Sequence, residues 1–523
     1  MINNFANLES ILTKNFNLNS FRKGQKEIIS TILSNKDVMG VLPTGGGKSL
    51  CYQFIAVYYN KLVVVVSPLI ALMKDQVYNL NKIGIPAGCI YYNQPIEEKK
   101  EVFAKMAQKG SFVLYLSPER IQKTGFHEWI KNQDVALFAI DEAHCISQWG
   151  HDFREEYTSL SVLRSLQPNV PIIALTASAT PLVLNDIAKQ LQIQNADRKV
   201  YGFYRPNLFY QVTECENEDE KIDWIASALN KFTEGRKIIY CGTRKNTEYV
   251  CEILKQNFQG VAHYHAGMST QERTQIQDDY QNGKLNILVA TNAFGMGVDQ
   301  PNVRLVIHYN MPSNIDSLYQ EMGRAGRDDK DSTCLLLYSK KDKGLQVYFI
   351  ESSESNPEIK KLRWKNLNAL ISYSEGSECR HSEILTYFKD SHRIKRCGHC
   401  DVCEPKSERM VQFSKKQKSI FSRILNNSEV ESSKKNAGNI KSIKNNSTLD
   451  LDVESESRYQ KLRVWRKEIA EEKDLPAFVI FHDKTLKEIA AINPQSLDEL
   501  RKIKGMGDKK IEDYGWDILA ELK

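Results

Sequence analysis

The sequence predicts an α/β fold with two tandem lobes built on parallel sheets, followed by a helical cysteine-rich subdomain, a flexible linker and a small all-helical domain. Short runs of branched apolar residues alternate with helical segments as far as residue 338, which is typical of strands buried in parallel sheets. The alternation restarts near residue 205, so we expect two lobes. Four late cysteines and a polar stretch precede a last helical segment. The predicted domain boundaries are 1–205, 206–338, 339–405, 406–455 and 456–523.

Length and composition limit the possible classes of protein. A chain of 523 residues is too long for one hydrophobic core, and its 41% hydrophobic and 26% charged residues are typical of a soluble globular protein. The net charge of +6 permits nucleic-acid binding without indicating it. We find no pattern of a signal peptide and no apolar run long enough to cross a membrane. We therefore expect a cytoplasmic protein without membrane partners, associated with the nucleoid if the source is prokaryotic.

Residues 41–49, Val-Leu-Pro-Thr-Gly-Gly-Gly-Lys-Ser, are the centre of the first lobe. They lie between a predicted strand at residues 38–42 and a predicted helix at residues 50–59, which is the P-loop pattern. Consecutive glycines let backbone N–H groups approach a phosphate chain closely. Lys48 would reach the β- and γ-phosphates, and the hydroxyl of Ser49 would bind Mg²⁺. The predicted phosphate cradle consists of Thr44, Gly45, Gly46, Gly47, Lys48 and Ser49.

Four more predicted strands of this lobe, at residues 62–66, 112–116, 135–140 and 172–175, each end in a polar cluster. Open parallel sheets bind ligands at these carboxyl ends. Asp141 and Glu142 follow the third of these strands. We predict that Asp141 holds Mg²⁺ and that Glu142 orients and deprotonates the attacking water. The alternative is a pair that only caps the next helix.

A loop at residues 146–154 interleaves aromatic, histidine and arginine side chains around a glycine. Aromatic rings beside an arginine suit stacking on unpaired bases together with phosphate contacts. The candidate nucleic-acid-binding residues are Trp149, His151, Phe153 and Arg154. The alternative is a loop whose aromatic side chains fold back onto the core.

The second lobe has predicted strands at residues 237–240, 287–290 and 305–309 but no P-loop of its own. This pattern indicates a cleft between two lobes, one with the P-loop and one with an arginine. Arg324 and Arg327 are three residues apart on a predicted helix and therefore share a face. An arginine delivered across the cleft can neutralise charge on the γ-phosphate. The alternative is a surface pair.

The ordered set of motifs resembles the superfamily 2 helicases, whose two lobes are RecA-like. The set comprises the P-loop, Asp-Glu-Ala-His at 141–144, Thr-Ala-Ser-Ala-Thr at 176–180 and Gln-Glu-Met-Gly-Arg-Ala-Gly-Arg at 320–327. Three longer stretches resemble the RecQ family of DNA helicases: Phe-Arg-Lys-Gly-Gln at 21–25, the whole of 141–154, and Ala-Thr-Asn-Ala-Phe-Gly-Met-Gly-Val-Asp at 290–299. The resemblance covers residues 15–405 and resumes near residue 456.

This resemblance implies an ATP-dependent 3′–5′ DNA helicase that acts in recombination and repair. It implies that Arg22 and Gln25 contact the adenine and that residues 149–154 couple DNA binding to hydrolysis. It also implies that Arg327 is the arginine finger, assisted by Arg324. Expected partners are single-stranded and tailed or forked DNA, with a single-stranded-DNA-binding protein as a candidate. The alternatives are an RNA helicase and an ATP-switched scaffold that anneals DNA or binds junctions.

Cys397, Cys400 and Cys403 share one short stretch downstream of Cys379. Four thiolates complete the tetrahedral shell of a structural zinc ion, and no further cysteine follows soon enough for an iron–sulfur pattern. Alternative ligands are His381, His392 and His399. Buried free thiols are the other alternative. The RecQ family has the same arrangement, which implies a four-cysteine zinc site with no open position for catalysis.

Residues 406–455 are rich in Lys, Ser and Asn, and about fifty polar residues cannot form the winged-helix domain that many RecQ proteins carry. We therefore predict a flexible linker without that domain. Residues 456–523 regain helical periodicity and resemble the HRDC module. The expected core of this module is Trp465, Ile469, residues 478–481, Ile489 and Leu500. The turn at 505–507, with Lys509 and Lys510, either holds a DNA phosphate or only packs.

Overall fold

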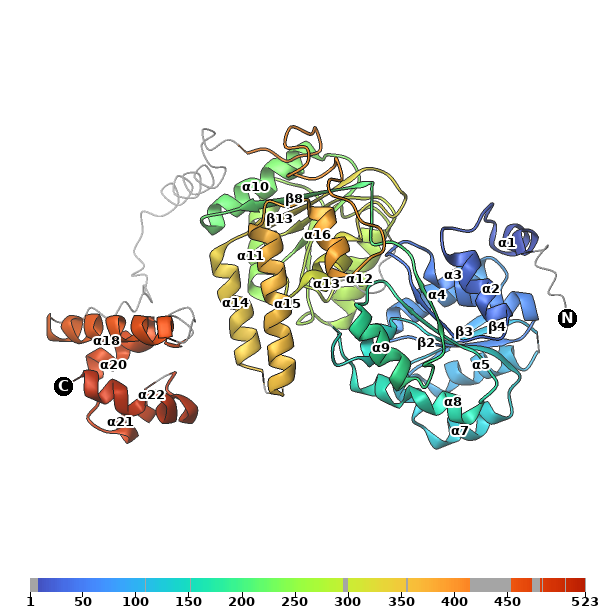
Figure 1. Cartoon of the computed structure of the whole chain (residues 1–523), viewed down its shortest axis with the longest axis horizontal. Coiled ribbons are helices and arrows are strands. Elements are labelled where there is room, and N and C mark those ends of the chain that lie inside the picture. The colour runs from blue at the N-terminus through green and yellow to red at the C-terminus, as the bar shows by residue number, and fades with distance from the viewer. Residues whose placement is uncertain are drawn as a thin grey trace, which may run out of the picture. The chain divides into compact units, whose positions relative to one another are not determined.

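The computed structural model describes residues 8–108, 110–150, 152–294, 300–353, 356–413, 453–472, 480–481, 483–503 and 505–522 (Figure 1). One compact unit holds two parallel sheets and the cysteine-rich region, and a second unit holds residues 344–352 together with the C-terminal helices. None of the helices in these ranges combines the length and the apolar character that a membrane span needs.

The first sheet has seven strands in the order β3-β4-β2-β5-β6-β1-β7, and its strand pairs are parallel. Figure 1 draws it in blue to green among its helices. The strands are β1 (Val38–Val41), β2 (Leu62–Val66), β3 (Ala87–Ile90), β4 (Phe112–Leu116), β5 (Val135–Ile140), β6 (Ile172–Thr176) and β7 (Asp197–Val200). The helices are α1 (Leu8–Phe16), α2 (Gln25–Leu33), α3 (Lys48–Tyr59), α4 (Ile70–Lys82), α5 (Ile96–Met106), α6 (Pro118–Ile121), α7 (Thr124–Lys131), α8 (Val162–Leu166) and α9 (Pro181–Gln190), with 3-10 turns at Ala143–Ile146 and Glu155–Ser161.

Branched apolar residues form this sheet because they suit strands that are covered on both faces. All residues of β2 and β4 are buried, and helices α2 and α3 contribute Ile28 and Phe54 to the core against them. Val41 at the end of β1 is the register partner of Thr176, and Val66 at the end of β2 is the register partner of Ile140. The polar clusters that follow these strands therefore share one edge of the sheet.

The second sheet has six parallel strands in the order β10-β11-β9-β12-β13-β8. The strands are β8 (Leu208–Glu214), β9 (Arg236–Tyr240), β10 (Val261–Tyr264), β11 (Ile287–Ala290), β12 (Val303–His308) and β13 (Ser332–Tyr338). The helices are α10 (Glu218–Lys231), α11 (Arg244–Lys255), α12 (Thr270–Gln281) and α13 (Ile315–Met322). Strand β8 is an edge strand whose outer side needs a partner.

The cysteine-rich region supplies that partner. It follows α14 (Lys340–Glu351) and α15 (Pro357–Glu375) and comprises α16 (Arg380–Tyr387) and the loop after it. Cys400 forms a parallel bridge with Tyr210 of β8, and the Asp401 carboxylate accepts hydrogen bonds from the backbone of Val212 at 2.8 Å and from Arg380 Nε at 2.9 Å. The loop therefore extends the edge of the second sheet.

The C-terminal unit is helical, with α18 (Val453–Glu472), α20 (Asp483–Ile492), α21 (Leu497–Arg501) and α22 (Asp508–Glu521). Four of the residues predicted for its core are buried, namely Trp465, Phe481, Ile489 and Leu500, and the predicted Ile469 packs against them. Residues 478–479 lie outside the described residues. Lys510 donates to the Ile480 carbonyl at 2.8 Å and lies 4.6 Å from the centre of the Phe481 ring, so this lysine serves packing. The side chain of Lys509 is not among those described.

The two-sheet α/β class is confirmed, and the predicted strands 62–66, 112–116, 135–140 and 287–290 coincide with β2, β4, β5 and β11. The strands β3, β7, β8, β10 and β13 were not predicted. β7 alternates half-buried with exposed residues, which is the pattern of a polar edge strand rather than of a buried one. Residues 414–452 of the predicted linker and 295–299 of the motif at 290–299 lie outside the described residues.

Candidate functional site

The P-loop connects β1 to α3, and Lys48 and Ser49 are the first two residues of that helix. Gly45 and Gly47 have left-handed φ angles of 78° and 70°, which an L-residue rarely adopts. The backbone N–H of Gly46 donates to the Pro43 carbonyl at 2.8 Å and closes the turn. The loop therefore presents the start of α3, where backbone N–H groups and the helix dipole favour an anion.

Arg22 and Gln25 donate hydrogen bonds to backbone carbonyls of the P-loop. Gln25 is buried and donates to the carbonyls of Gly46 at 3.1 Å and Gly47 at 2.9 Å, and Arg22 donates to the Gly45 carbonyl. A side chain at Gly47 would have its Cβ 2.4 Å from Gln25 Nε2, so the glycine is needed for this contact as well as for the turn. The contact of Arg22 and Gln25 with adenine stays a prediction.

Asp141 and Glu142 follow β5 at the edge where the P-loop lies. The Asp141 backbone N–H donates to the Val66 carbonyl at 2.9 Å, and its buried carboxylate accepts from the Glu142 N–H at 3.0 Å. Burial and, next, the charge of Glu142 raise the pKa of Asp141 to about 7. A buried carboxylate with a raised pKa at the end of a strand fits a divalent cation, because a cation offsets the cost of burying its charge.

His144 connects this pair to the next strand end. Its Nδ1 lies 3.3 Å from Glu142 Oε2 and 2.9 Å from Thr176 Oγ1. The Thr176 hydroxyl donates to the Ser178 carbonyl at 3.0 Å, so it accepts from His144. Ser178 Oγ in turn accepts from Gln320 Nε2 of α13 at 3.1 Å. These contacts therefore lead from Glu142 in the first lobe, through the backbone carbonyl and the separate side-chain hydroxyl of Ser178, to the helix that precedes the two arginines.

Arg327 lies against the P-loop. An added Cβ at Gly45 would lie 3.1 Å from Arg327 Cγ, and one at Gly323 would lie 2.0 Å from Thr44 Oγ1. Two glycines, one in each lobe, therefore permit this close approach. Arg324 is buried on the same turn. A cavity of about 600 Å³ opens beside the P-loop, and its charged lining consists of Arg22, Lys23, Arg205, Arg327 and Asp329.

Arg205 is a site residue that no sequence motif indicates. Its buried guanidinium donates to the Thr44 carbonyl at 3.1 Å and to the carbonyls of Ala325 at 3.2 Å and Gly326 at 2.9 Å. These partners lie 161, 120 and 121 positions away in the chain, so no local pattern contains them. The only sequence signal is an arginine between aromatic residues and Pro-Asn, at the point where the strand–helix alternation restarts.

The aromatic loop folds back only in part. Phe153 is 38% exposed and Trp149 is half-buried. Arg154 pairs with Asp152 at 3.3 Å and donates to the Pro68 carbonyl at 3.1 Å, so its guanidinium is engaged with protein groups. His151 lies outside the described residues. The role of these four residues in binding DNA stays a prediction.

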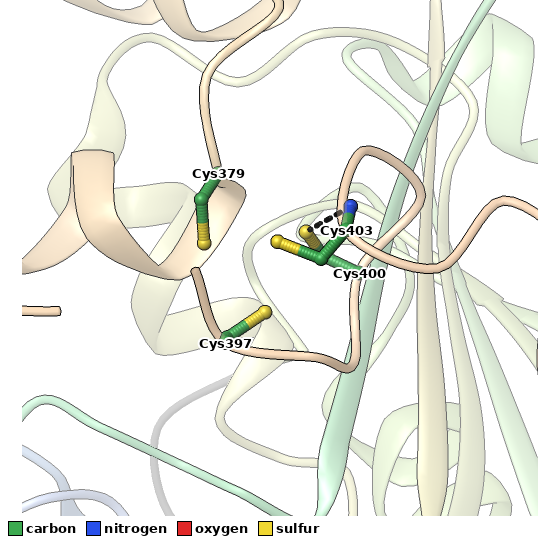
Figure 2. Close-up of side chains that lie close together, drawn as sticks. All are labelled: Cys379, Cys397, Cys400 and Cys403. Carbon is green, nitrogen blue, oxygen red and sulfur yellow. Dashed lines mark hydrogen bonds between the residues drawn. The ribbon is translucent and has the colours of Figure 1, made fainter. Parts of the chain in front are cut away.

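The four cysteine side chains converge, as Figure 2 shows. Cys379 stands at the start of α16, and Cys397, Cys400 and Cys403 come from the loop after it. Their sulfur atoms all lie within 4.8 Å of one another, which suits four thiolates around one zinc ion. The backbone N–H of His399 donates to Cys397 Sγ at 3.3 Å, and that of Cys403 donates to Cys400 Sγ at 3.4 Å. Such donors favour the thiolate form.

Two of the three alternative histidines, His381 and His399, have other hydrogen-bond partners. His381 contacts the Leu208 carbonyl through Nε2 at 3.1 Å. His399 contacts the same carbonyl through Nδ1 at 3.1 Å and the Tyr204 hydroxyl through Nε2 at 2.8 Å. With both ring nitrogens engaged, His399 does not replace a cysteine in the zinc shell. The zinc site therefore consists of the four cysteines Cys379, Cys397, Cys400 and Cys403.

Family models match four stretches of the chain. They are the DEAD/DEAH box helicase at residues 22–187, the helicase conserved C-terminal domain at 220–329, the RecQ zinc-binding domain at 340–404 and the HRDC domain at 455–522. No model of a winged-helix domain matches, as the sequence predicted. The two sheets, the P-loop and the arginine helix thus define a two-lobed ATPase of the DEAD/DEAH box helicase class.

Curated relatives narrow this class to one family. The ATP-dependent DNA helicase RecQ of Haemophilus influenzae is 34% identical over 98% of this chain and 95% of its own length. RecQ of Bacillus subtilis is 34% identical over 98% of both chains. The chain belongs to the RecQ family of ATP-dependent DNA helicases. Among solved structures, S. cerevisiae Dbp5 bound to RNA and ADP BeF3 aligns with a TM-score of 0.54 at 19% identity, over 69% of this chain and 99% of that one, which shows a shared fold alone.

Proposed function

We propose that this chain is a 3′–5′ DNA helicase that hydrolyses ATP between its two lobes and moves along single-stranded DNA to separate duplexes. The observation that carries the proposal is the approach of Arg327 to Gly45 of the P-loop. It supports the proposal because an arginine of the second lobe lies beside the P-loop of the first, in a chain of the RecQ family. ATP turnover would then depend on the relation between the lobes.

The P-loop residues Thr44, Gly45, Gly46 and Gly47 would cradle the phosphates with backbone N–H groups, and Lys48 would contact the β- and γ-phosphates. Ser49 and Asp141 would hold Mg²⁺, which when bound supplies charge neutralisation on the β- and γ-phosphates. The raised pKa of Asp141, about 7, supports this assignment because the ionised form is costly until a cation lies beside it. Arg22 and Gln25 would recognise the adenine from the edge of the loop that they already hold.

Glu142 would orient the attacking water and accept its proton. Its position 3.3 Å from His144, which contacts Thr176, supports a further role. A change in the carboxylate can be transmitted along these contacts to Ser178 and Gln320. Arg327 would stabilise charge on the γ-phosphate in the transition state. Arg324 would assist by fixing the position of the helical turn that carries Arg327.

Unpaired DNA bases would stack on Trp149 and Phe153, with His151 and Arg154 completing the contact. The exposure of Phe153 supports this, and Arg154 would have to leave Asp152 to reach a phosphate. The substrates would be single-stranded and tailed or forked DNA, with a single-stranded-DNA-binding protein as a candidate partner. We also propose the predicted boundaries of the two lobes and of the zinc-binding subdomain, since the matched ranges 22–187, 220–329 and 340–404 lie inside them. The HRDC domain would begin before residue 456, because its matched range starts at residue 455 and α18 starts at Val453.

The test is a gel assay of a duplex with a 3′ single-stranded tail, with wild type and the Lys48→Ala variant. Lys131→Ala, an exposed lysine at the end of α7, is the matched control. We expect unwinding by wild type and Lys131→Ala but not by Lys48→Ala, and a preference for the 3′ over the 5′ tail. Unwinding that survives Lys48→Ala would refute the assigned site. Equal ATPase stimulation by RNA would favour an RNA helicase, and DNA-stimulated turnover with an intact duplex would favour an annealing scaffold.

A further inference from the structure

The segment that joins the two sheets, residues 203–207, touches three parts of the molecule within five residues. We call this segment the connector; it links β7 to β8. Phe203 stacks on Phe388 at the end of α16 with ring centroids 4.1 Å apart, and its backbone N–H donates to Asp390 at 2.8 Å. Asn207 donates to the Gly326 carbonyl at 2.9 Å. The connector is therefore anchored at both ends.

On the side of the nucleotide site, the connector acts through Arg205. One arm of its guanidinium donates to Thr44 in the P-loop, and the other donates to Ala325 and Gly326, next to Arg327. A single buried cation thus ties the P-loop to the turn that carries the proposed arginine finger. Because guanidinium is planar and rigid, it fixes the relative position of these backbone segments.

On the side of the zinc site, the connector acts through Tyr204. A carbonyl oxygen only accepts hydrogen bonds, so His399 donates to Leu208 through Nδ1, and its Nε2 shares a hydrogen bond of 2.8 Å with the Tyr204 hydroxyl. The backbone N–H of the same histidine donates to the sulfur of Cys397. One residue therefore contacts a zinc ligand with its backbone and the connector with its ring.

We propose that Tyr204 and Arg205 are positioning residues that couple the zinc site to the ATP site. The route runs from Cys397 through His399 to the Tyr204 hydroxyl, and from the adjacent Arg205 to Thr44 and Gly326. The inference rests on the proposed function, since it assigns consequences to the P-loop and to Arg327. Zinc would then affect nucleotide affinity through the side chains of Tyr204 and Arg205, in addition to its role in folding the cysteine loop.

Removing only the Tyr204 hydroxyl should weaken nucleotide binding while the zinc site stays filled. In Tyr204→Phe the ring remains among His381, His392 and His399, so packing is kept, and the lost hydrogen bond corresponds to about a threefold to tenfold change in an equilibrium. We expect the dissociation constant of a fluorescent ADP analogue and the KM for ATP to rise by about that factor, with kcat within about twofold. Arg205→Lys should act in the same direction, because lysine cannot span both sets of carbonyls.

Matched controls separate these effects from general damage. Tyr78→Phe removes the hydroxyl of a tyrosine that is 68% exposed, and Arg198→Lys changes an exposed arginine that contacts Asn185. Both controls should keep the wild-type dissociation constant. Zinc content, measured by colorimetric release after denaturation, should be the same in wild type, both controls and Tyr204→Phe.

Zinc removal tests the coupling itself. Chelation should raise the dissociation constant of the ADP analogue for wild type, and by a smaller factor for Tyr204→Phe, because the contact through which zinc acts is already absent there. Equal factors in the two proteins would overturn the proposal. A Tyr204→Phe protein that keeps its zinc and has wild-type nucleotide affinity would also overturn the proposal. This comparison needs no chelation, so it tests the proposal even if chelation unfolds the cysteine loop. Failure of wild type to unwind a tailed duplex would count against the helicase assignment alone, because nucleotide affinity is measured without DNA.

Discussion

At the scale of single residues, Glu142 stands out because its backbone is left-handed, with φ of 46°. A side chain other than glycine in this region costs about 1 kcal/mol or more. Two hydrogen bonds maintain this conformation. The Glu142 N–H donates to the Asp141 carboxylate, and the Glu142 carbonyl accepts from the Cys145 N–H at 2.9 Å. The turn places two adjacent carboxylates at one edge of the sheet, the first buried at the end of β5 and the second beside His144.

Glu142→Gln should abolish most ATP turnover and keep nucleotide binding. Glutamine has the same shape but cannot accept a proton from water, so we expect kcat to fall by about 10²-fold or more. The dissociation constant of an ADP analogue should change little, since Lys48 and the P-loop remain. Single-turnover hydrolysis with and without single-stranded DNA measures the effect, and Glu128→Gln, an exposed glutamate on α7, is the control. Turnover within tenfold of wild type would remove Glu142 from the role of base.

We expect the stability of the second lobe to depend on pH because of His263. Burial and, next, the stacked His265, whose ring centroid lies 5.3 Å away, lower the pKa of His263. Between this lowered pKa and the unfolded value of about 6.5, the unfolded chain binds more protons, so the free energy of unfolding falls as the pH drops through that window. Melting temperatures of wild type and His263→Asn at about pH 7.5 and about pH 5.5 measure this. The variant should lose less stability on acidification, and an equal loss would contradict the assignment.

At the scale of elements, local motifs and long-range contacts differ in how well they can be predicted. The P-loop could be predicted because the strand, the glycines and Lys-Ser all fall within one short stretch. Strand β5 and the pair Asp141-Glu142 could be predicted for the same reason. Arg205 and Tyr204 could not, since their partners lie 161 and 195 positions away. Strand β3 was missed because Ala-Gly-Cys-Ile has a single branched apolar residue, Ile90, instead of the run of branched residues that marks a buried strand.

The loop at residues 397–403 should depend on its metal. Cys397→Ser removes one of four ligands, and we expect bound zinc to fall well below one ion per chain and the first thermal transition to drop by roughly 10 °C. The loss should be large because the same loop covers the edge of β8 through Cys400 and Asp401. Cys89→Ser, a buried cysteine of β3 outside the cluster, should keep its zinc. A zinc-loaded Cys397→Ser protein would mean that another side chain completes the shell.

At the scale of the whole molecule, the chain contains two folding units with separate cores. Buried residues of the first sheet cluster with α1, α2 and α3, whereas those of α18, α20, α21 and α22 form a cluster of their own. A domain with its own core can unfold alone. Calorimetry of the whole chain should therefore resolve a C-terminal transition that is independent of nucleotide and of zinc, since the P-loop and the cysteines belong to the other unit.

A chain that ends at residue 452 tests this division. It lacks the HRDC domain, matched at residues 455–522, but keeps both sheets and the four cysteines. We expect one zinc ion per chain, DNA-stimulated ATP turnover within about twofold of the full chain, and loss of the C-terminal transition alone. A change confined to DNA affinity would place the HRDC domain in substrate binding. Loss of zinc or of nucleotide binding on truncation would instead mean that the two units are not independent, and the separate-core interpretation would be wrong.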